Sequence, residues 1–274
     1  MTTINNKHVL ITGGASGLGR RLVQRCAEMG AAVTILDVDE AGAEAAADEA
    51  AARGAGPIRA FVCDVGDNKQ VAACAADVLA AQGQVDILVN NAGIVSGRPL
   101  LELSDEHIER TFRVNTLALF WTTKAFLPAM IARGSGHIVN VASAAGLIGS
   151  PRETDYATSK FAAVGFNEAL RLELKRSAPG VKTTVVRPFY IDTGMFAGVN
   201  TRFPLLLPIL KEADVTERIL RAIQRDTAQV DMPWMVRTLP LMRLLPVWAF
   251  DGLADFFGIT GAMDEFTGRP AAER

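Results

Sequence analysis

Short apolar runs separated by longer helical stretches dominate the first 190 residues of this chain. The runs typical of strands cover residues 8–12, 32–36, 57–63, 85–89 and 182–186, with a further candidate at 228–232. Uninterrupted apolar strands are typical of a parallel sheet that is covered by helices on both faces. The pattern therefore predicts right-handed βαβ units and an α/β fold, a doubly wound parallel sheet of about seven strands.

Helical periodicity is found at residues 20–29, 41–53, 154–176 and 214–225. The C-terminal part is less regular. Residues 203–210 are apolar and broken by prolines, and residues 233–257 carry many large apolar side chains that two arginines and two prolines interrupt, so they form no bilayer-spanning helix. We expect about residues 195–257 of this hydrophobic extension to cover a substrate. Core packing, a subunit interface and an interfacial membrane segment are the alternatives.

The composition fits one domain that spans residues 1–274. The chain is 49% hydrophobic and 21% charged, which is enough for one large core. Its formal net charge of −2 lacks the excess of positive charge that is typical of nucleic-acid binding. Three cysteines and three histidines are scattered without metal-ligand spacing, so we expect no metal site and a reducing compartment. The first strand starts within ten residues, which leaves no room for a signal peptide or anchor and predicts a cytoplasmic protein.

A glycine-rich turn joins the first predicted strand to the first predicted helix. Strand, glycine turn and helix N-terminus in this order form a cradle for phosphate, because the backbone approaches closely and the helix dipole attracts the anion. The candidates for binding the pyrophosphate of a dinucleotide are Gly13, Ser16, Gly17, Leu18 and Gly19. Their spacing departs from Gly-x-Gly-x-x-Gly, so an ordinary tight turn is the alternative.

Asp37 ends the second predicted strand, about twenty residues beyond the glycines. A carboxylate there accepts hydrogen bonds from an adenosine ribose and repels a 2′-phosphate, so it favours NAD over NADP. Arg20 and Arg21 are nearby cations that either compensate for this charge or belong to a solvated first helical turn.

Two further strand ends carry small, acidic or amide side chains. Asp64 and Val65 follow the third predicted strand, where they would meet an adenine ring. Asn91, Ala92 and Gly93 follow the fourth, where they suit close contact with a ribose. Ligands bind outside the carboxyl ends of strands in such sheets, although Asp and Asn also cap ordinary helices. The succession of such ends along the chain favours one shared nucleotide site.

Tyr156 and Lys160 stand four residues apart in the predicted helix 154–176, and Ser143 lies thirteen residues before the tyrosine. Side chains at i and i+4 reach the same side of a helix. We expect the ammonium to lower the pKa of the tyrosine below about 10, so that it exchanges a proton with an alcohol or a carbonyl. Ser143 could donate a hydrogen bond to the reacting oxygen. A lone Tyr-x-x-x-Lys also occurs by chance in helices.

Together these motifs resemble the short-chain dehydrogenases/reductases over about residues 7–200. The resemblance implies a Rossmann fold in which Tyr156 is the general acid/base and Ser143 polarises the substrate oxygen. It also implies that Lys160 lowers the pKa of the tyrosine and holds the nicotinamide ribose, and that Asn115 holds a water in the proton relay. A polar helical residue that bonds the backbone is the alternative for Asn115.

The loop after the predicted strand 182–186 departs from the family pattern. The family usually has Pro-Gly there, whereas this chain has Pro188-Phe189. Pro188, Ile191 and Thr193 still match the positions that contact the nicotinamide carboxamide, so the resemblance implies this role for them. A bulky residue in place of this glycine, followed by Thr193-Gly194-Met195, makes the loop similar to that of one branch of the family. The members of this branch are membrane-associated dehydrogenases that act on retinol, hydroxysteroids and long-chain lipids. Phe189 either narrows the site or packs against the loop.

The sequence therefore predicts an oxidoreductase that transfers a hydride between NAD(H) and a hydrophobic alcohol or ketone. Steroids, retinoids and long-chain alcohols are the expected substrates, and the resemblance implies a homodimer or homotetramer. The alternatives are an NADP-dependent reductase of a smaller ketone, a non-catalytic NAD-binding protein and a structural partner in a membrane complex. Peripheral membrane contact through the apolar C-terminal segment is left open.

Overall fold

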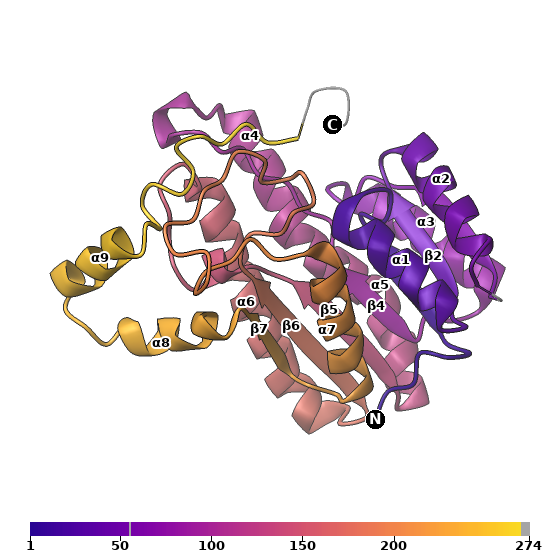
Figure 1. Cartoon of the computed structure of the whole chain (residues 1–274). Coiled ribbons are helices and arrows are strands. Elements are labelled where there is room, and N and C mark those ends of the chain that lie inside the picture. The colour runs from indigo at the N-terminus through magenta and orange to yellow at the C-terminus, as the bar shows by residue number, and fades with distance from the viewer. Residues whose placement is uncertain (55, 270–274) are drawn as a thin grey trace.

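Seven parallel strands form one sheet at the centre of the molecule (Figure 1). The computed structural model describes residues 1–54 and 56–269. The strands are β1 (His8–Thr12), β2 (Ala32–Asp37), β3 (Ile58–Val62), β4 (Ile87–Asn90), β5 (Gly136–Val141), β6 (Val181–Pro188) and β7 (Gln229–Met232). They lie in the order β3-β2-β1-β4-β5-β6-β7, and neighbouring strands run parallel. The predicted doubly wound α/β fold is confirmed.

Helices cover both faces of the sheet and form two separate cores. The helices are α1 (Gly17–Glu28), α2 (Glu40–Ala51), α3 (Asn68–Gln82), α4 (Asp105–Phe112), α5 (Ala118–Arg133), α6 (Thr154–Ser177), α7 (Glu212–Gln224), α8 (Leu239–Met242) and α9 (Val247–Phe256). Alternate strand residues point to opposite faces. On one face α1, α2 and α7 pack against Val9 and Ile35, and on the other α3, α5 and α6 pack against Leu10 and Leu88.

A chain of buried side chains ties α5, the sheet and α6 together. Thr122 of α5 donates to Oδ1 of Asn90 at 2.7 Å, and Nδ2 of Asn90 donates to Asn140 at 2.9 Å. Asn140 donates in turn to Asn167 of α6 at 3.0 Å. A buried amide that lost its partner would cost about 1–3 kcal/mol. The chain therefore fixes α6 against β4 and β5.

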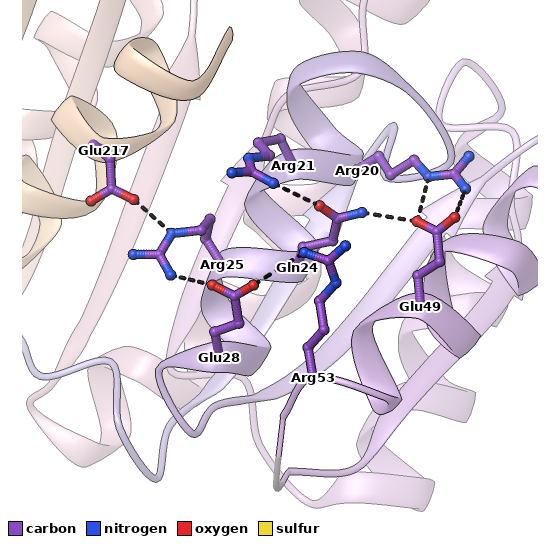
Figure 2. A network of polar contacts seen from close by, with 8 residues as sticks. All are labelled: Arg20, Arg21, Gln24, Arg25, Glu28, Glu49, Arg53 and Glu217. Carbon is purple, nitrogen blue, oxygen red and sulfur yellow. Dashed lines mark hydrogen bonds and ion pairs between the residues drawn. The ribbon is translucent and has the colours of Figure 1, made fainter.

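Charged side chains link α1 to the two helices beside it (Figure 2). Arg20 pairs with Glu49 of α2 at 2.5 Å, and Arg25 pairs with Glu217 of α7 at 2.6 Å. Exposed ion pairs contribute about 0–1 kcal/mol each, so the apolar core supplies most of the packing energy between these helices. The network nevertheless decides where the guanidinium of Arg20 points, which matters for the site below.

The apolar C-terminal stretch forms short helical pieces beside the sheet. A 3₁₀ helix (Trp234–Thr238) follows β7 and leads into α8 and α9, which lie at the edge of the molecule (Figure 1). Leu239 and Ala254 pack inward on Ile148, whereas Leu244 and Trp248 are 81% and 79% exposed. Over residues 1–54 and 56–269, no helix is both long enough and apolar enough to cross a membrane.

Candidate active site

One pocket of about 730 Å³ lies at the carboxyl ends of the strands and collects nearly all of the predicted site residues. They are Gly13, Ser16, Gly17, Leu18, Gly19, Asp37, Asp64, Val65, Asn91, Ala92, Gly93, Ser143, Tyr156, Lys160, Pro188, Ile191 and Thr193. The strands are parallel, so their carboxyl ends share one edge of the sheet. Asn115 lies buried behind the pocket wall. In the part of the chain that the structure describes, no group of three or more His, Cys, Asp or Glu side chains could hold a metal ion.

The glycine loop is packed too tightly for larger side chains. A Cβ atom at Gly19 would lie 1.9 Å from the carbonyl oxygen of Gly13, and one at Gly13 would lie 2.8 Å from Cα of Ala92. Gly17 has a φ of +51°, which favours glycine. Helix α1 begins there, with no side chain capping its N-terminus and no acidic residue in its first turn. These features fit an anionic group such as the pyrophosphate of a dinucleotide.

Asp37 stands on the pocket wall at the end of β2 and also holds the glycine loop. Its Oδ2 accepts a hydrogen bond from the N–H of Ala15 at 2.9 Å, and its Oδ1 accepts from the N–H of Asp39 at 3.1 Å. The carboxylate therefore has a structural role in the loop as well as the position predicted for a ribose contact.

Arg20 and Arg21 lie partly exposed in the first turns of α1, where both have protein partners. Arg20 donates from Nε and Nη2 to Glu49 at 3.1 and 2.5 Å, and Arg21 donates to Oε1 of Gln24 at 3.1 Å (Figure 2). Both guanidinium groups are thus engaged in the polar network of α1. These contacts fit the alternative of a partly solvated helical turn better than compensation for the charge of Asp37.

Asp64 reaches the pocket but its carboxylate has protein partners. Arg110 donates from Nη1 to both carboxylate oxygens at 2.9 and 2.7 Å, and the N–H of Gly66 donates to Oδ1 at 2.8 Å. Arg110 also lines the pocket, although it was not predicted as a site residue. It comes from α4, 46 residues further along the chain, and no local spacing indicates this pairing.

Asn91 shapes the pocket by joining the ends of β1 and β4. Its Nδ2 donates to the carbonyl oxygens of Thr12 and Gly13 at 3.0 and 3.1 Å. The hydroxyl of Thr12 accepts from the N–H groups of Asn91 and Ala92, both at 3.0 Å. The side-chain donors of Asn91 therefore bind the backbone, while Asn91, Ala92 and Gly93 all line the pocket and their contact with a ribose stays a prediction.

Tyr156 and Lys160 lie in the first two turns of α6 and line the same pocket, as the spacing predicted. The ammonium of Lys160 donates to the carbonyl oxygen of Val141 at 3.0 Å and lies 5.5 Å from the centroid of the Tyr156 ring. Ser143 follows β5, and its hydroxyl donates to the carbonyl oxygen of Pro188 at 3.4 Å. Three polar side chains from α6 and the end of β5 therefore line one pocket.

Asn115 supports this group from behind. It lies in a π-helical segment (Arg113–Leu117) between α4 and α5. Its Oδ1 accepts from the N–H of Ile94 at 2.9 Å, and its Nδ2 donates to the carbonyl oxygen of Ile94 and to Ser159. A Cβ atom at Gly93 would lie 3.4 Å from Oδ1 of Asn115 and 3.5 Å from Nζ of Lys160. Gly93 therefore leaves room where these two polar groups approach the pocket.

The charge states in the site differ from the prediction. Burial raises the pKa of the Tyr156 hydroxyl above its ordinary value, the Glu153 carboxyl raises it further, and a hydrogen bond with Ser143 lowers it. Burial also lowers the pKa of Lys160 to about 8. The expectation that Lys160 brings the pKa of Tyr156 below 10 is therefore wrong for this arrangement, because desolvation disfavours the charged form of both side chains.

Glu153 is a pocket residue that the sequence did not reveal. It is only 2% exposed, its Oε2 accepts from the hydroxyl of Tyr190 at 3.4 Å, and its Oε1 has no hydrogen-bond partner in the structure. Burial raises its pKa from 4.5 to about 7. The surrounding sequence from Arg152 to Asp155 is polar throughout, which is typical of an exposed helix start and hides this burial.

The end of the pocket beside Tyr156 is aromatic. The ring centroid of Phe196 lies 5.6 Å from that of Tyr156 and 5.1 Å from that of Tyr190. Phe189 and Met195 line the same wall. Of the region 195–257, Met195 and Phe196 reach the pocket, while the helices α8 and α9 pack behind Phe189. Residues 266–269, which were not predicted, line the pocket as well.

Comparison with known proteins gives consistent results. The family model described as short chain dehydrogenase matches residues 7–203. The human epidermal retinol dehydrogenase 2 is 42% identical over 94% of this chain and 84% of its own length.

Solved structures of short-chain dehydrogenases are also similar to this chain. One is a short chain dehydrogenase/reductase from Burkholderia phymatum in complex with NAD, with a TM-score of 0.80 and 28% identity over 89% of this chain and 95% of that one. Another is a metagenomic short-chain oxidoreductase in complex with NADP, with a TM-score of 0.71 and 28% identity over 84% of this chain and 98% of that one.

Glu153 gives the stability of this chain an expected pH dependence. Its pKa in the folded protein is raised to about 7, so its contribution is fully present below pH 4.5 and is lost as the pH rises through 7. Each pKa unit corresponds to about 1.4 kcal/mol. We therefore expect the unfolding free energy of the wild type to fall by roughly 3 kcal/mol relative to Glu153→Gln between pH 4 and 8.

Denaturant unfolding at several pH values measures this difference. Glu168→Gln, at an exposed position of α6, is the matched control and should differ from the wild type by a constant amount. A Glu153→Gln difference that does not change with pH would contradict the prediction.

Proposed function

This chain belongs to the short-chain dehydrogenase family of oxidoreductases, and we propose that it transfers a hydride between NAD(H) and a hydrophobic alcohol or the corresponding carbonyl compound. The observation that carries the proposal is the convergence of Ser143, Tyr156 and Lys160 on a pocket that continues to the glycine loop. A non-catalytic nucleotide-binding protein would need only the glycine loop and the strand ends. The presence of all three polar side chains supports turnover.

In this proposal each polar side chain has a distinct task. The nicotinamide ring, when bound, supplies the hydride acceptor or donor. In the reducing direction Tyr156 gives its phenolic proton to the carbonyl oxygen, and in the oxidising direction its phenolate takes the proton of the alcohol. Ser143 donates a hydrogen bond to the same oxygen. Lys160 and Asn115, which both lie close to Gly93, hold the nicotinamide ribose and the water of the proton relay.

Loss of the Tyr156 hydroxyl should remove most of the activity. General acid–base catalysis contributes about 10²- to 10⁴-fold, so we expect Tyr156→Phe to lower kcat by that factor and leave the Kd for NADH nearly unchanged. Tyr190→Phe is the matched control, since it deletes the only other tyrosine hydroxyl of the chain, which donates to Glu153. It should keep kcat within about tenfold of the wild type. Half of the wild-type rate in Tyr156→Phe would exclude this mechanism.

Asp37 supports NAD as the cofactor. Its carboxylate lies on the pocket wall beside the glycine loop, where it would repel a 2′-phosphate. The nearby Arg20 is paired with Glu49 and so does not offset this charge. The contrast between a carboxylate on the wall and an engaged arginine favours NAD over NADP.

Replacing Asp37 should therefore narrow the cofactor preference. We expect the wild type to have a higher kcat/KM with NAD than with NADP, and Asp37→Ser to reduce that ratio about tenfold or more by relieving repulsion. Asp48→Ser, an exposed carboxylate of α2, should leave the ratio unchanged. Equal use of both cofactors by the wild type would favour the alternative, an NADP-dependent reductase of a smaller ketone.

The aromatic wall supports a lipophilic substrate. Phe189, Met195 and Phe196 line the pocket, and the ring of Phe196 lies edge-on to that of Tyr156. The human relative carries the name of a retinol dehydrogenase, and retinol is a long apolar alcohol. We therefore include retinoids, steroids and long-chain alcohols as substrate classes, with Met195 and Phe196 as the part of the expected covering region, residues 195–257, that lines the pocket.

Catalytic efficiency should rise with the apolar surface of the substrate. Each buried methylene contributes about 0.8 kcal/mol, so kcat/KM should increase about fourfold per methylene along a series of primary alcohols until the pocket is filled. In Phe196→Ala the increase of kcat/KM per methylene should be smaller, because the substitution removes part of the apolar wall of the pocket. A flat or falling series in the wild type would show that the natural substrate is small.

The exposed surface of α8 and α9 supports a contact with a further apolar partner. Leu241, Leu244, Val247 and Trp248 are between 68% and 81% exposed, and the exposed Arg243 lies among them in sequence. Exposed apolar side chains of this kind suit a membrane surface, which we include in the proposal as a peripheral contact. Self-association into the predicted homodimer or homotetramer would cover the same surface, and vesicle flotation separates the two.

A further inference from the structure

A segment near the C-terminus, residues 262–269, lies along the loop that follows β6. The N–H groups of Thr267 and Gly268 both donate to the carbonyl oxygen of Ala197, at 2.9 and 3.2 Å. Figure 1 shows this segment as the yellow coil that leads from α9 toward the C-terminus. We call it the C-terminal strap.

Close packing against two glycines fixes the position of the C-terminal strap. A Cβ atom at Gly97 would lie 2.0 Å from Cε1 of Phe266, and one at Gly198 would lie 2.0 Å from the carbonyl oxygen of Glu265. Both glycines also have positive φ, at +67° and +85°. The strap therefore fits where it does because two positions of the pocket loops have no side chain.

The strap brings Arg269 to the glycine loop. Its Nη1 donates to Oγ of Ser16 at 2.8 Å, and its Nη2 donates to the carbonyl oxygen of Thr193 at 3.4 Å. A Cβ atom at Gly17 would lie 3.4 Å from Nη2. Ser16 precedes α1, but its hydroxyl accepts the hydrogen bond from Arg269 and does not cap the helix. The N–H groups at the start of α1 are therefore left for other acceptors. A guanidinium and a helix N-terminus therefore face the same part of the pocket.

We infer that Arg269 is a further cofactor-binding residue, which the strap carries to the pyrophosphate from a position 253 residues beyond Ser16. A guanidinium offers parallel N–H donors that match two phosphate oxygens, and it adds charge to the dipole of α1. Other pocket cations are held elsewhere: Arg110 by Asp64 and Lys160 by the carbonyl oxygen of Val141. The strap would then close over the phosphates and couple the C-terminus to cofactor binding.

Affinity measurements on the full chain test this assignment, which rests on the proposed cofactor. The Kd of NADH is measured by energy transfer from tryptophan to the nicotinamide, and those of ADP-ribose and adenosine by competition. We expect Arg269→Gln to weaken NADH and ADP-ribose about ten- to a hundredfold and adenosine less than twofold, since only adenosine lacks the pyrophosphate. Arg269→Lys should recover part of the affinity and covers the case in which the glutamine variant fails to fold. Arg176→Gln, at an exposed position of α6, removes the same charge and should change nothing.

The outcomes separate the inference from the proposed function. Absence of NADH and NADPH binding in the wild type would overturn the proposed function itself. If the wild type binds NADH, unchanged affinity in Arg269→Gln or an equal loss for adenosine would overturn only the role of Arg269. Tighter binding in Arg269→Gln would overturn it too, because it would show that the guanidinium competes with the cofactor for the N-terminus of α1.

Discussion

The attachment of α6 to the sheet is the constraint on which the rest of the site depends. The amides of Asn140 and Asn167 meet at 3.0 Å, and Lys160 donates to the last residue of β5, also at 3.0 Å. A buried amide or ammonium without its partner costs several kcal/mol, so α6 cannot slide along the sheet without losing both contacts. Tyr156 lies one turn before Lys160 and is thereby held beside the ends of β5 and β6.

Burial then decides which charges the pocket tolerates. Near Tyr156, desolvation raises the pKa of the tyrosine and of Glu153 and lowers the pKa of Lys160 to about 8, so burial shifts each of these groups toward its neutral form. At the other end, α1 begins without a capping side chain and Arg269 lies beside it. The pocket therefore has one end suited to an anion and another suited to proton exchange beside apolar groups. This polarity matches a ligand with phosphates at one end and a reacting carbon at the other.

The C-terminal third adds to this pocket in two different ways. The strap enters it directly, with Phe266 seated over Gly97 and Arg269 at the glycine loop. Helices α8 and α9 stay outside and pack behind Phe189 and Ile148, with their outer apolar side chains left on the surface. The strap therefore lines the pocket directly, whereas α8 and α9 have no direct contact with the reacting groups.

Local patterns in the sequence were enough for six of the seven strands, the glycine loop and the spacing of Tyr156 and Lys160, whereas β5 was not among the predicted strands. Strand periodicity, positive φ at Gly17 and the i to i+4 relation each arise within a few residues, so the chain encodes them directly. Contacts between distant residues were decided by the tertiary structure alone. Arg110 donates to the carboxylate of Asp64, and Arg269 donates to Ser16 from 253 residues away. The direction of the pKa shift at Tyr156 was decided there too. It depends on how much water the surrounding segments exclude together, and no short stretch of sequence contains that information.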